Sequence, residues 1–111
     1  MDRIAEFRAL IKDTMTEWAE FLGAPKGVEN ILVFDENSDN YVWVYTGWEG
    51  KTHVNHTVVH LAIRDGKIHV YHDGLEEGLV ADLIKGGIAE KEIVIEWHPT
   101  YQRQYTPFAL S

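Results

Sequence analysis

Residues 1–22 carry apolar side chains at intervals of three and four, with charged residues mostly between them. The apolar positions are Ile4, Phe7, Leu10, Ile11, Met15, Trp18, Phe21 and Leu22. This period predicts one amphipathic helix, which Gly23 and Pro25 end. We expect its apolar stripe to pack in the core.

From residue 28 the pattern becomes that of strands rich in Val, Ile, Tyr, Trp and Thr. Four such segments follow one another: Val28–Asp35, Asn40–Trp48, Lys51–Arg64 and Lys67–Asp73. They are separated by the loop 37–40, by Glu49-Gly50 and by the two-residue hairpin signal Asp65-Gly66. Short connections between consecutive strands predict a four-stranded antiparallel meander.

The rest of the chain returns briefly to a helical period. Leu75–Lys85 is predicted as a second helix, with Asp73 and Glu76 as an N-terminal capping pair and Gly86-Gly87 as its end. A short fifth strand over Glu92–Trp97 is broken at Pro99, and a C-terminal tail follows without clear period. The pattern predicts a single α+β domain over residues 1–111.

Regular closure of the two tight hairpins predicts the register of the sheet. It pairs Arg64 with Lys67, Ala62 with His69, His60 with Tyr71, Tyr45 with Val54, Trp43 with His56 and Tyr41 with Val58. Because side chains alternate between faces, one face would form a floor for the helices. That face carries Val42, Val44, Thr57, Val59, Leu61, Ile63, Ile68 and Val70.

The opposite face would be aromatic and rich in histidine, with Tyr41, Trp43, Tyr45, Val54, His56, Val58, His60, His69 and Tyr71. A solvated face is usually polar, whereas this composition is typical of an interface core. We expect the C-terminal tail, a second copy of the chain or another protein to cover it. A bulge in either strand would exchange the faces beyond it.

The amino-acid composition and charge exclude several kinds of functional site. The chain has no cysteine, which excludes disulfides, Cys-ligated zinc, iron–sulfur clusters and thiol nucleophiles. Its net charge is −8 and its basic residues are scattered, which disfavours direct nucleic acid binding. The charged N-terminus lacks a signal-peptide h-region, and no segment approaches the ~18 apolar residues of a membrane span. We expect a cytoplasmic protein without membrane contact.

Six histidines invite a metal hypothesis. His56 and His60 would lie ~13 Å apart along one strand, too far to share an ion. His60 and His69 would be diagonal neighbours, but a third ligand is lacking on that face. We therefore expect packed or surface histidines, and no metal or cofactor.

The run His72-Asp73 and Glu76-Glu77 gathers groups that acid–base chemistry could use, although helix capping explains it better. The sequence has no G-x-S-x-G motif and no glycine-rich phosphate loop. We expect no catalytic residues and no enzymatic activity.

Four blocks in order resemble the XisI family: LVFDENSDNYVWVYTGWEG, VVHLAIRDGKIHVYHDG, EEGLVADLIKGGIAEKEIVIEWHP and YQRQYTPFA. Together they span nearly the whole chain. Leu75 and His53 depart from the family pattern, at positions where Thr and a basic residue are expected. The resemblance implies the XisI-like α+β fold. It also implies a controlling factor for developmentally regulated excision of the fdxN element in heterocyst-forming cyanobacteria, where a separate recombinase cuts and rejoins the DNA.

The family offers no catalytic residues to carry over, so the expected site is a partner-binding surface. Its predicted residues are Tyr41, Trp43, Tyr45, His56, His60 and Tyr71, with Trp48, His72, Asp73, His98, Arg103 and Tyr105 as weaker candidates. The expected partner is an XisH-like protein, and a homodimer through the same face is a further expectation. Alternatives are a small-ligand- or metal-binding protein or enzyme centred on His60, His69 and His72, and an antitoxin-like regulator of a nuclease-like XisH partner.

Overall fold

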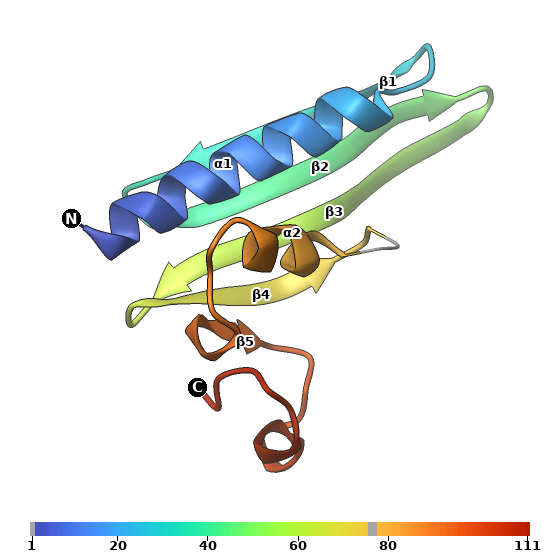
Figure 1. Cartoon of the computed structure of the whole chain (residues 1–111). Coiled ribbons are helices and arrows are strands. Elements are labelled where there is room, and N and C mark those ends of the chain that lie inside the picture. Colours follow the sequence, from blue (N-terminus) through green and yellow to red (C-terminus); the bar gives the residue numbers. More distant parts are fainter. Residues whose placement is uncertain (1, 76–77) are drawn as a thin grey trace.

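The computed structural model describes residues 2–75 and 78–111. Its elements are α1 (Arg3–Leu22), β1 (Val28–Asp35), β2 (Asn40–Glu49), β3 (Thr52–Arg64), β4 (Lys67–Asp73), α2 (Leu79–Lys85) and β5 (Ile93–Ile95). Two short 3-10 turns, Glu90–Glu92 and Thr100–Tyr105, flank β5. The strands form one sheet in the order β1-β2-β3-β4-β5 (Figure 1). Strands β1 to β4 pair antiparallel, as predicted, and β5 pairs parallel to β4.

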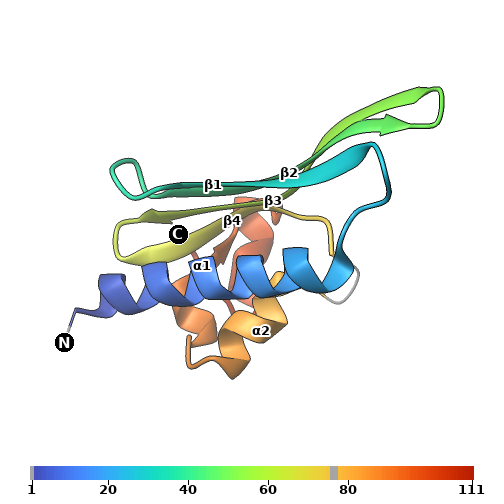
Figure 2. The same cartoon turned by 90° about the horizontal axis from the view of Figure 1, so that it is seen from above.

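Both helices pack on the same side of the sheet (Figure 2). The buried core lies between them and the sheet. From α1 it takes Phe7, Ile11, Met15 and Ala19, from α2 Leu79 and Leu83, and from the sheet Tyr41, Trp43, Val59, Leu61, Ile63, Ile68, Val70, Ile93 and Ile95. The predicted stripe of α1 is therefore largely confirmed. Phe21 and Leu22 are the exceptions, because they are 80% and 52% exposed at the end of the helix.

The second helix begins at Leu79, later than the predicted Leu75. The Asp73 carboxylate accepts hydrogen bonds from the backbone N–H groups of Leu75, Leu79 and Val80, at 3.2, 2.6 and 3.4 Å. It thus satisfies N–H groups that the first turn leaves without helical partners. Asp73 therefore does bind the first turn of α2, but the N-cap residue is Gly78; Glu76 and its neighbour Glu77 lie outside the described residues.

The predicted assignment of faces was wrong for the inner half of β2. The β2–β3 hairpin closes around Gly50-Lys51 rather than Glu49-Gly50, so that Tyr45 pairs with His56. The register then shifts, because Trp43 pairs with Val59 while Val44 pairs with Thr57. This leaves Val58 as the extra residue of a β-bulge, which exchanges the two faces beyond it.

As a result, Tyr41 and Trp43 lie beneath the helices, with 0% and 1% of their surface exposed. They are core residues and not part of a partner-binding surface. Each polar tip finds a partner, as buried Tyr and Trp side chains usually do. Trp43 Nε1 donates to Asn30 Oδ1 at 2.8 Å, and the Tyr41 hydroxyl donates to Asp39 Oδ1 at 2.8 Å. Correspondingly, Val42 and Val44 lie on the other face instead of forming the helix floor.

A second irregularity affects β4. The pairs Arg64–Lys67 and Ala62–His69 are confirmed. The predicted pair of His60 with Tyr71 was wrong, because the register shifts there and His60 pairs with His72. Tyr71 is then the extra residue, although its ring still lies 4.9 Å from that of His60.

Beyond these irregularities β2 and β3 continue as an arm, residues 45–56, which Figure 2 shows projecting away from the helices. β1 pairs with the arm at residues 45–47, and residues 48–53 form its two-stranded tip. At the base of the arm, the backbone N–H of Trp48 donates to Gly27 O at 2.8 Å. Gly47 comes directly before Trp48. Gly47 has φ +143°, and a Cβ there would lie 2.1 Å from Gly27 O. Only glycine fits at this crossing.

Among residues 2–75 and 78–111, no helix is long and apolar enough to cross a membrane.

Candidate protein-contact site

The side of the sheet turned away from α1 and α2 has an apolar centre, and we call it the open face. Alternation from the buried positions assigns to it Ile31, Val33, Val42, Val44, Thr57, His60, Ala62, His69 and Tyr71. Val33, Tyr71 and Ile31 are 49%, 41% and 37% exposed.

The charged residues of the described part of this face lie at its ends. Glu29 and Asp35 bound the apolar stretch of β1, while Arg64 and Lys67 lie at the β3–β4 turn. A centre without charge and with exposed aliphatic and aromatic side chains has the composition of a protein interface core.

Strand β1 shows how the sequence produces this surface. Its burial alternates strictly along VENILVFD, and Leu32 and Phe34 pack against the core. In a strand with one solvated face, the positions between them would be polar. Here they are Ile31 and Val33, so that the strand is apolar on both faces.

Three rings lie next to one another on the open face. The ring centroids of His60 and Tyr71 are 4.9 Å apart, and those of Tyr71 and His69 are 6.4 Å apart. His60 Nε2 lies 3.1 Å from Asn40 Oδ1. Burial lowers the pKa of His60, and the positive charge of Arg64 lowers it further. The neutral imidazole is therefore the favoured form, which keeps this part of the face uncharged.

The C-terminal tail reaches the β4–β5 end of this face. His69 Nδ1 lies 2.7 Å from Glu96 Oε1, and Arg103 contacts the same carboxylate at 3.4 Å. Arg103 also donates to the backbone oxygens of His98 and Leu110 at 2.9 and 3.1 Å. These contacts make Arg103 a residue that fixes the tail. The aliphatic part of the face on β1 and β2 stays uncovered.

The other predicted site residues are spread over three regions. The ring centroids of Tyr45 and His56 lie 5.2 Å apart across the arm, and those of Trp48 and His53 lie 4.9 Å apart, with Trp48 56% exposed. His98 lines a hollow of about 330 Å³ at the end of β5. His72 pairs with His60 in the ladder, and Tyr105 is 82% exposed in the tail. Of the predicted set, the structure brings Tyr45 next to His56 on the arm, and His60 next to Tyr71 on the open face, with His69 beside Tyr71.

In the described part of the chain, no group of three or more His, Asp or Glu side chains converges. Nothing in that part of the structure therefore supports a metal centre. The rings of His60 and His69 each lie next to that of Tyr71. His69 Nε2 is buried without a hydrogen-bond partner among these residues.

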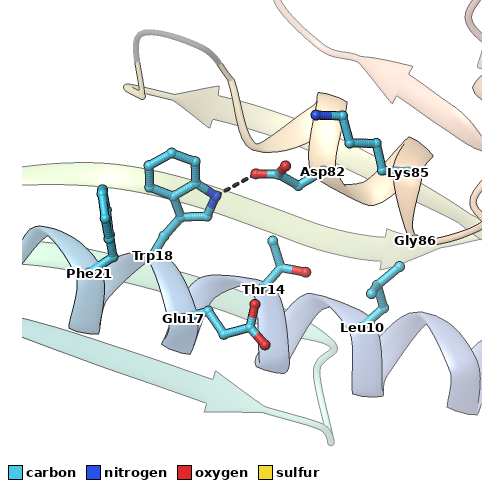
Figure 3. A pocket seen from close by; sticks show the side chains of 8 residues that line it. All are labelled: Leu10, Thr14, Glu17, Trp18, Phe21, Asp82, Lys85 and Gly86. Atoms are coloured by element: carbon cyan, nitrogen blue, oxygen red, sulfur yellow. Dashed lines mark hydrogen bonds between the residues drawn. The ribbon is translucent and has the colours of Figure 1, made fainter.

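A second hollow lies between the helices (Figure 3). It has a volume of about 640 Å³ and is lined by Leu10, Thr14, Glu17, Trp18, Phe21, Asp82, Lys85 and Gly86. Trp18 Nε1 donates a hydrogen bond to Asp82 Oδ2 across it. This bond joins α1 to α2, so Trp18 and Asp82 serve in packing the helices. The open face is the better candidate for a contact surface.

Sequence reasoning missed the aliphatic residues of the open face. Ile31 and Val33 were part of a predicted strand but of no predicted surface, and Val42 and Val44 were placed under the helices. The signal was the presence of apolar residues at both odd and even positions of VENILVFD. That pattern predicts a strand in contact on both faces.

Comparison with known proteins identifies relatives of the whole chain. The XisI protein family matches residues 1–110. The crystal structure of the fdxN element excision controlling factor XisI from Anabaena variabilis ATCC 29413 is 29% identical, with a TM-score of 0.85, over 99% of this chain and 100% of that one. A XisI-like protein from the same organism is 27% identical, with a TM-score of 0.91, over 96% and 98%. Comparison with curated proteins gave no match. The chain therefore belongs to the XisI family.

Proposed function

We propose that this protein is a non-enzymatic accessory factor in site-specific excision of the fdxN DNA element, and that it acts by binding an XisH-like partner through the open face. Family membership supports the link to excision, since one relative is described as an fdxN element excision controlling factor. The observation that supports the mode of action is the exposed apolar surface of the open face, to which Ile31 and Val33 on the edge strand β1 and Tyr71 on β4 contribute.

Protein binding accounts for this surface better than DNA binding does. Affinity for a duplex comes largely from Lys and Arg contacts with phosphates. The net charge is −8, and the two basic residues of the open face, Arg64 and Lys67, lie at one end of it. A partner with a complementary apolar patch would gain from covering the centre, because burying apolar surface is favourable.

Co-expression with an XisH-like protein tests the contact. We expect the wild-type chain to co-purify with it in stoichiometric amount. Ile31→Glu should abolish co-purification, because an ionised carboxylate would be buried against apolar surface.

Ile84→Glu is the matched control. Ile84 is 36% exposed and Ile31 37%, so the two changes remove the same side chain at equal exposure. Ile84 lies on α2, which packs on the opposite side of the sheet. Loss of the partner with both variants, or with neither, would contradict the proposed surface.

The role in excision needs its own readout. In a host that lacks the endogenous factor, a reporter scored by rejoining of the element's ends should be restored by the wild type and by Ile84→Glu. Ile31→Glu should not restore it. Full excision by Ile31→Glu would separate the function from this face.

A further inference from the structure

The arm leaves one edge of β3 unpaired. β3 runs from Thr52 to Arg64 and pairs with β2 along most of this length, but with β4 only from Val59 onward. The outer edge of residues 52–57 therefore has no neighbouring strand among the described residues (Figure 1). Next to it, Val58 O accepts a hydrogen bond from Gly74 N–H at 2.6 Å.

The register shows which backbone groups this edge presents. Glu49 and Thr52 close the two-residue hairpin, so their N–H and C=O groups point toward each other. Alternation along the strand then directs the backbone N–H and C=O groups of Val54 and His56 toward β2. It directs those of His53, Asn55 and Thr57 outward. Val58 O also points outward, because the bulge at Val58 interrupts the alternation there.

Nothing in the side chains protects the edge. Native edge strands are usually guarded by charges, Lys above all, or by Pro. The segment 52–58, THVNHTV, contains none of these. An open edge of this kind favours the addition of another strand.

We propose that a second copy of the chain adds to this edge, with its β3 antiparallel to the first across a two-fold axis near Val54. Homodimers with such an axis are the commonest assemblies of soluble proteins. His53 of one copy then lies opposite Asn55 of the other, and each such pair exchanges backbone hydrogen bonds through its outward groups. No like charges face each other along the joint.

Gly74 limits how far along β3 the axis can lie. Because it occupies the place opposite Val58, the added strand can reach Thr57 but not beyond. An axis at Val54 places Lys51 of the second copy opposite Thr57, just within this limit. An axis at Asn55 would place Thr52 of the second copy against Gly74.

The other free edge, β1, suits a second copy less well. Because Trp48 N–H donates to Gly27 O, the backbone N–H and C=O groups of the odd-numbered residues of β1 point toward β2. The backbone groups of Asn30, Leu32 and Phe34 then point outward, away from β2. Symmetric pairing of two β1 strands about Leu32 would place Glu29 of one copy opposite Asp35 of the other. Like charges directly opposite each other destabilise a strand pair.

The joint proposed here is independent of the open face. It would leave the open faces of both copies on one continuous sheet, free for a partner. A failure of this proposal would therefore not count against the proposed function.

Light scattering with size-exclusion chromatography tests the joint. We expect twice the chain mass for the wild type, and the chain mass for Asn55→Pro. Proline removes the outward N–H of residue 55 without touching the β2 ladder, and it is tolerated on edge strands. Asn55→Ala is the matched control, because it removes the same side chain but keeps the N–H, and it should remain a dimer. A circular dichroism spectrum like that of the wild type will show that Asn55→Pro is folded.

The absence of cysteine provides a second test. Val54→Cys should form a disulfide-linked dimer under mild oxidation, because only a residue near the axis lies opposite itself. Lys91→Cys, exposed just before β5 and separated from β3 by β4, should not. A monomeric wild type, a dimeric Asn55→Pro, or equal cross-linking of both cysteine variants would overturn the proposal.

Discussion

Trp43 offers the sharpest test of how the sheet is oriented. The sequence pattern alone placed it on an exposed face, whereas the bulge at Val58 turns it into the core. Its side chain is 1% exposed, and its Nε1 donates to Asn30 at 2.8 Å. Trp48, five residues further along β2, is 56% exposed. Replacing each by alanine removes the same atoms from two opposite environments.

The expected magnitudes differ several-fold. Truncating a buried Trp to Ala costs about 3–5 kcal/mol, from lost burial and the cavity left behind. We add nothing for the lost hydrogen bond, because Asn30 is only partly buried and water can reach it. A chain of 111 residues has a total stability of roughly 5–15 kcal/mol. Trp43→Ala should therefore remove a large part of it, while Trp48→Ala should cost about 0.5–1 kcal/mol.

Urea unfolding followed by far-UV circular dichroism measures both changes. The free energy of unfolding comes from the midpoint and slope of each transition. We expect a large drop in midpoint for Trp43→Ala and a small one for Trp48→Ala. A loss below about 1 kcal/mol for Trp43→Ala, or equal losses for the two variants, would refute the orientation of β2.

Three further predictions concern the arm, the acid limit of stability and the open face. Gly47→Ala should destabilise the fold by more than about 2 kcal/mol in urea unfolding, because its Cβ would meet a backbone oxygen at 2.1 Å, whereas Gly50→Ala, with open space around it, should cost about 1 kcal/mol. A hydrogen bond from Arg8 holds the pKa of Asp39 below its usual value, so this carboxylate stabilises the fold above the unfolded pKa of about 4 and loses that contribution as the pH falls further. Asp39→Asn should therefore lower the free energy of unfolding by about 1–2 kcal/mol at pH 7. It should also make that free energy fall less steeply as the solution is acidified, and an unchanged pH dependence would contradict the ion pair. Burial lowers the pKa of His60, so the unfolded chain takes up its proton first, and stability falls as the pH drops below about 6.5. Melting temperatures at pH 7 and 5 should differ less for His60→Gln than for the wild type, and an equal or larger difference would contradict this.

The sequence was sufficient for the elements and their order because each has a strong local signal. The period of α1 and the hairpin at Asp65-Gly66 depend on neighbouring residues only, and both predictions are confirmed. The parallel pairing of β5 with β4 has no local signal, since it depends on contacts between distant segments.

The faces could not be predicted for a different reason. Side chains alternate with period two, so one extra residue exchanges every position beyond it. Val58 and Tyr71 are such residues, and neither is marked by glycine or by any other bulge signal in the sequence. The predicted face was consequently correct for His60 and Tyr71, which lie on the open face, and wrong for Tyr41 and Trp43, which lie in the core.

The proposal that the open face binds a partner is tested most directly by the affinity for a purified XisH-like protein. Isothermal titration with the wild type, Ile31→Glu and Ile84→Glu, each checked for an unchanged fold, would measure it. We expect Ile31→Glu to raise Kd by about tenfold or more, equivalent to at least about 1.4 kcal/mol, and Ile84→Glu to leave Kd unchanged. Equal Kd values for all three chains would contradict it.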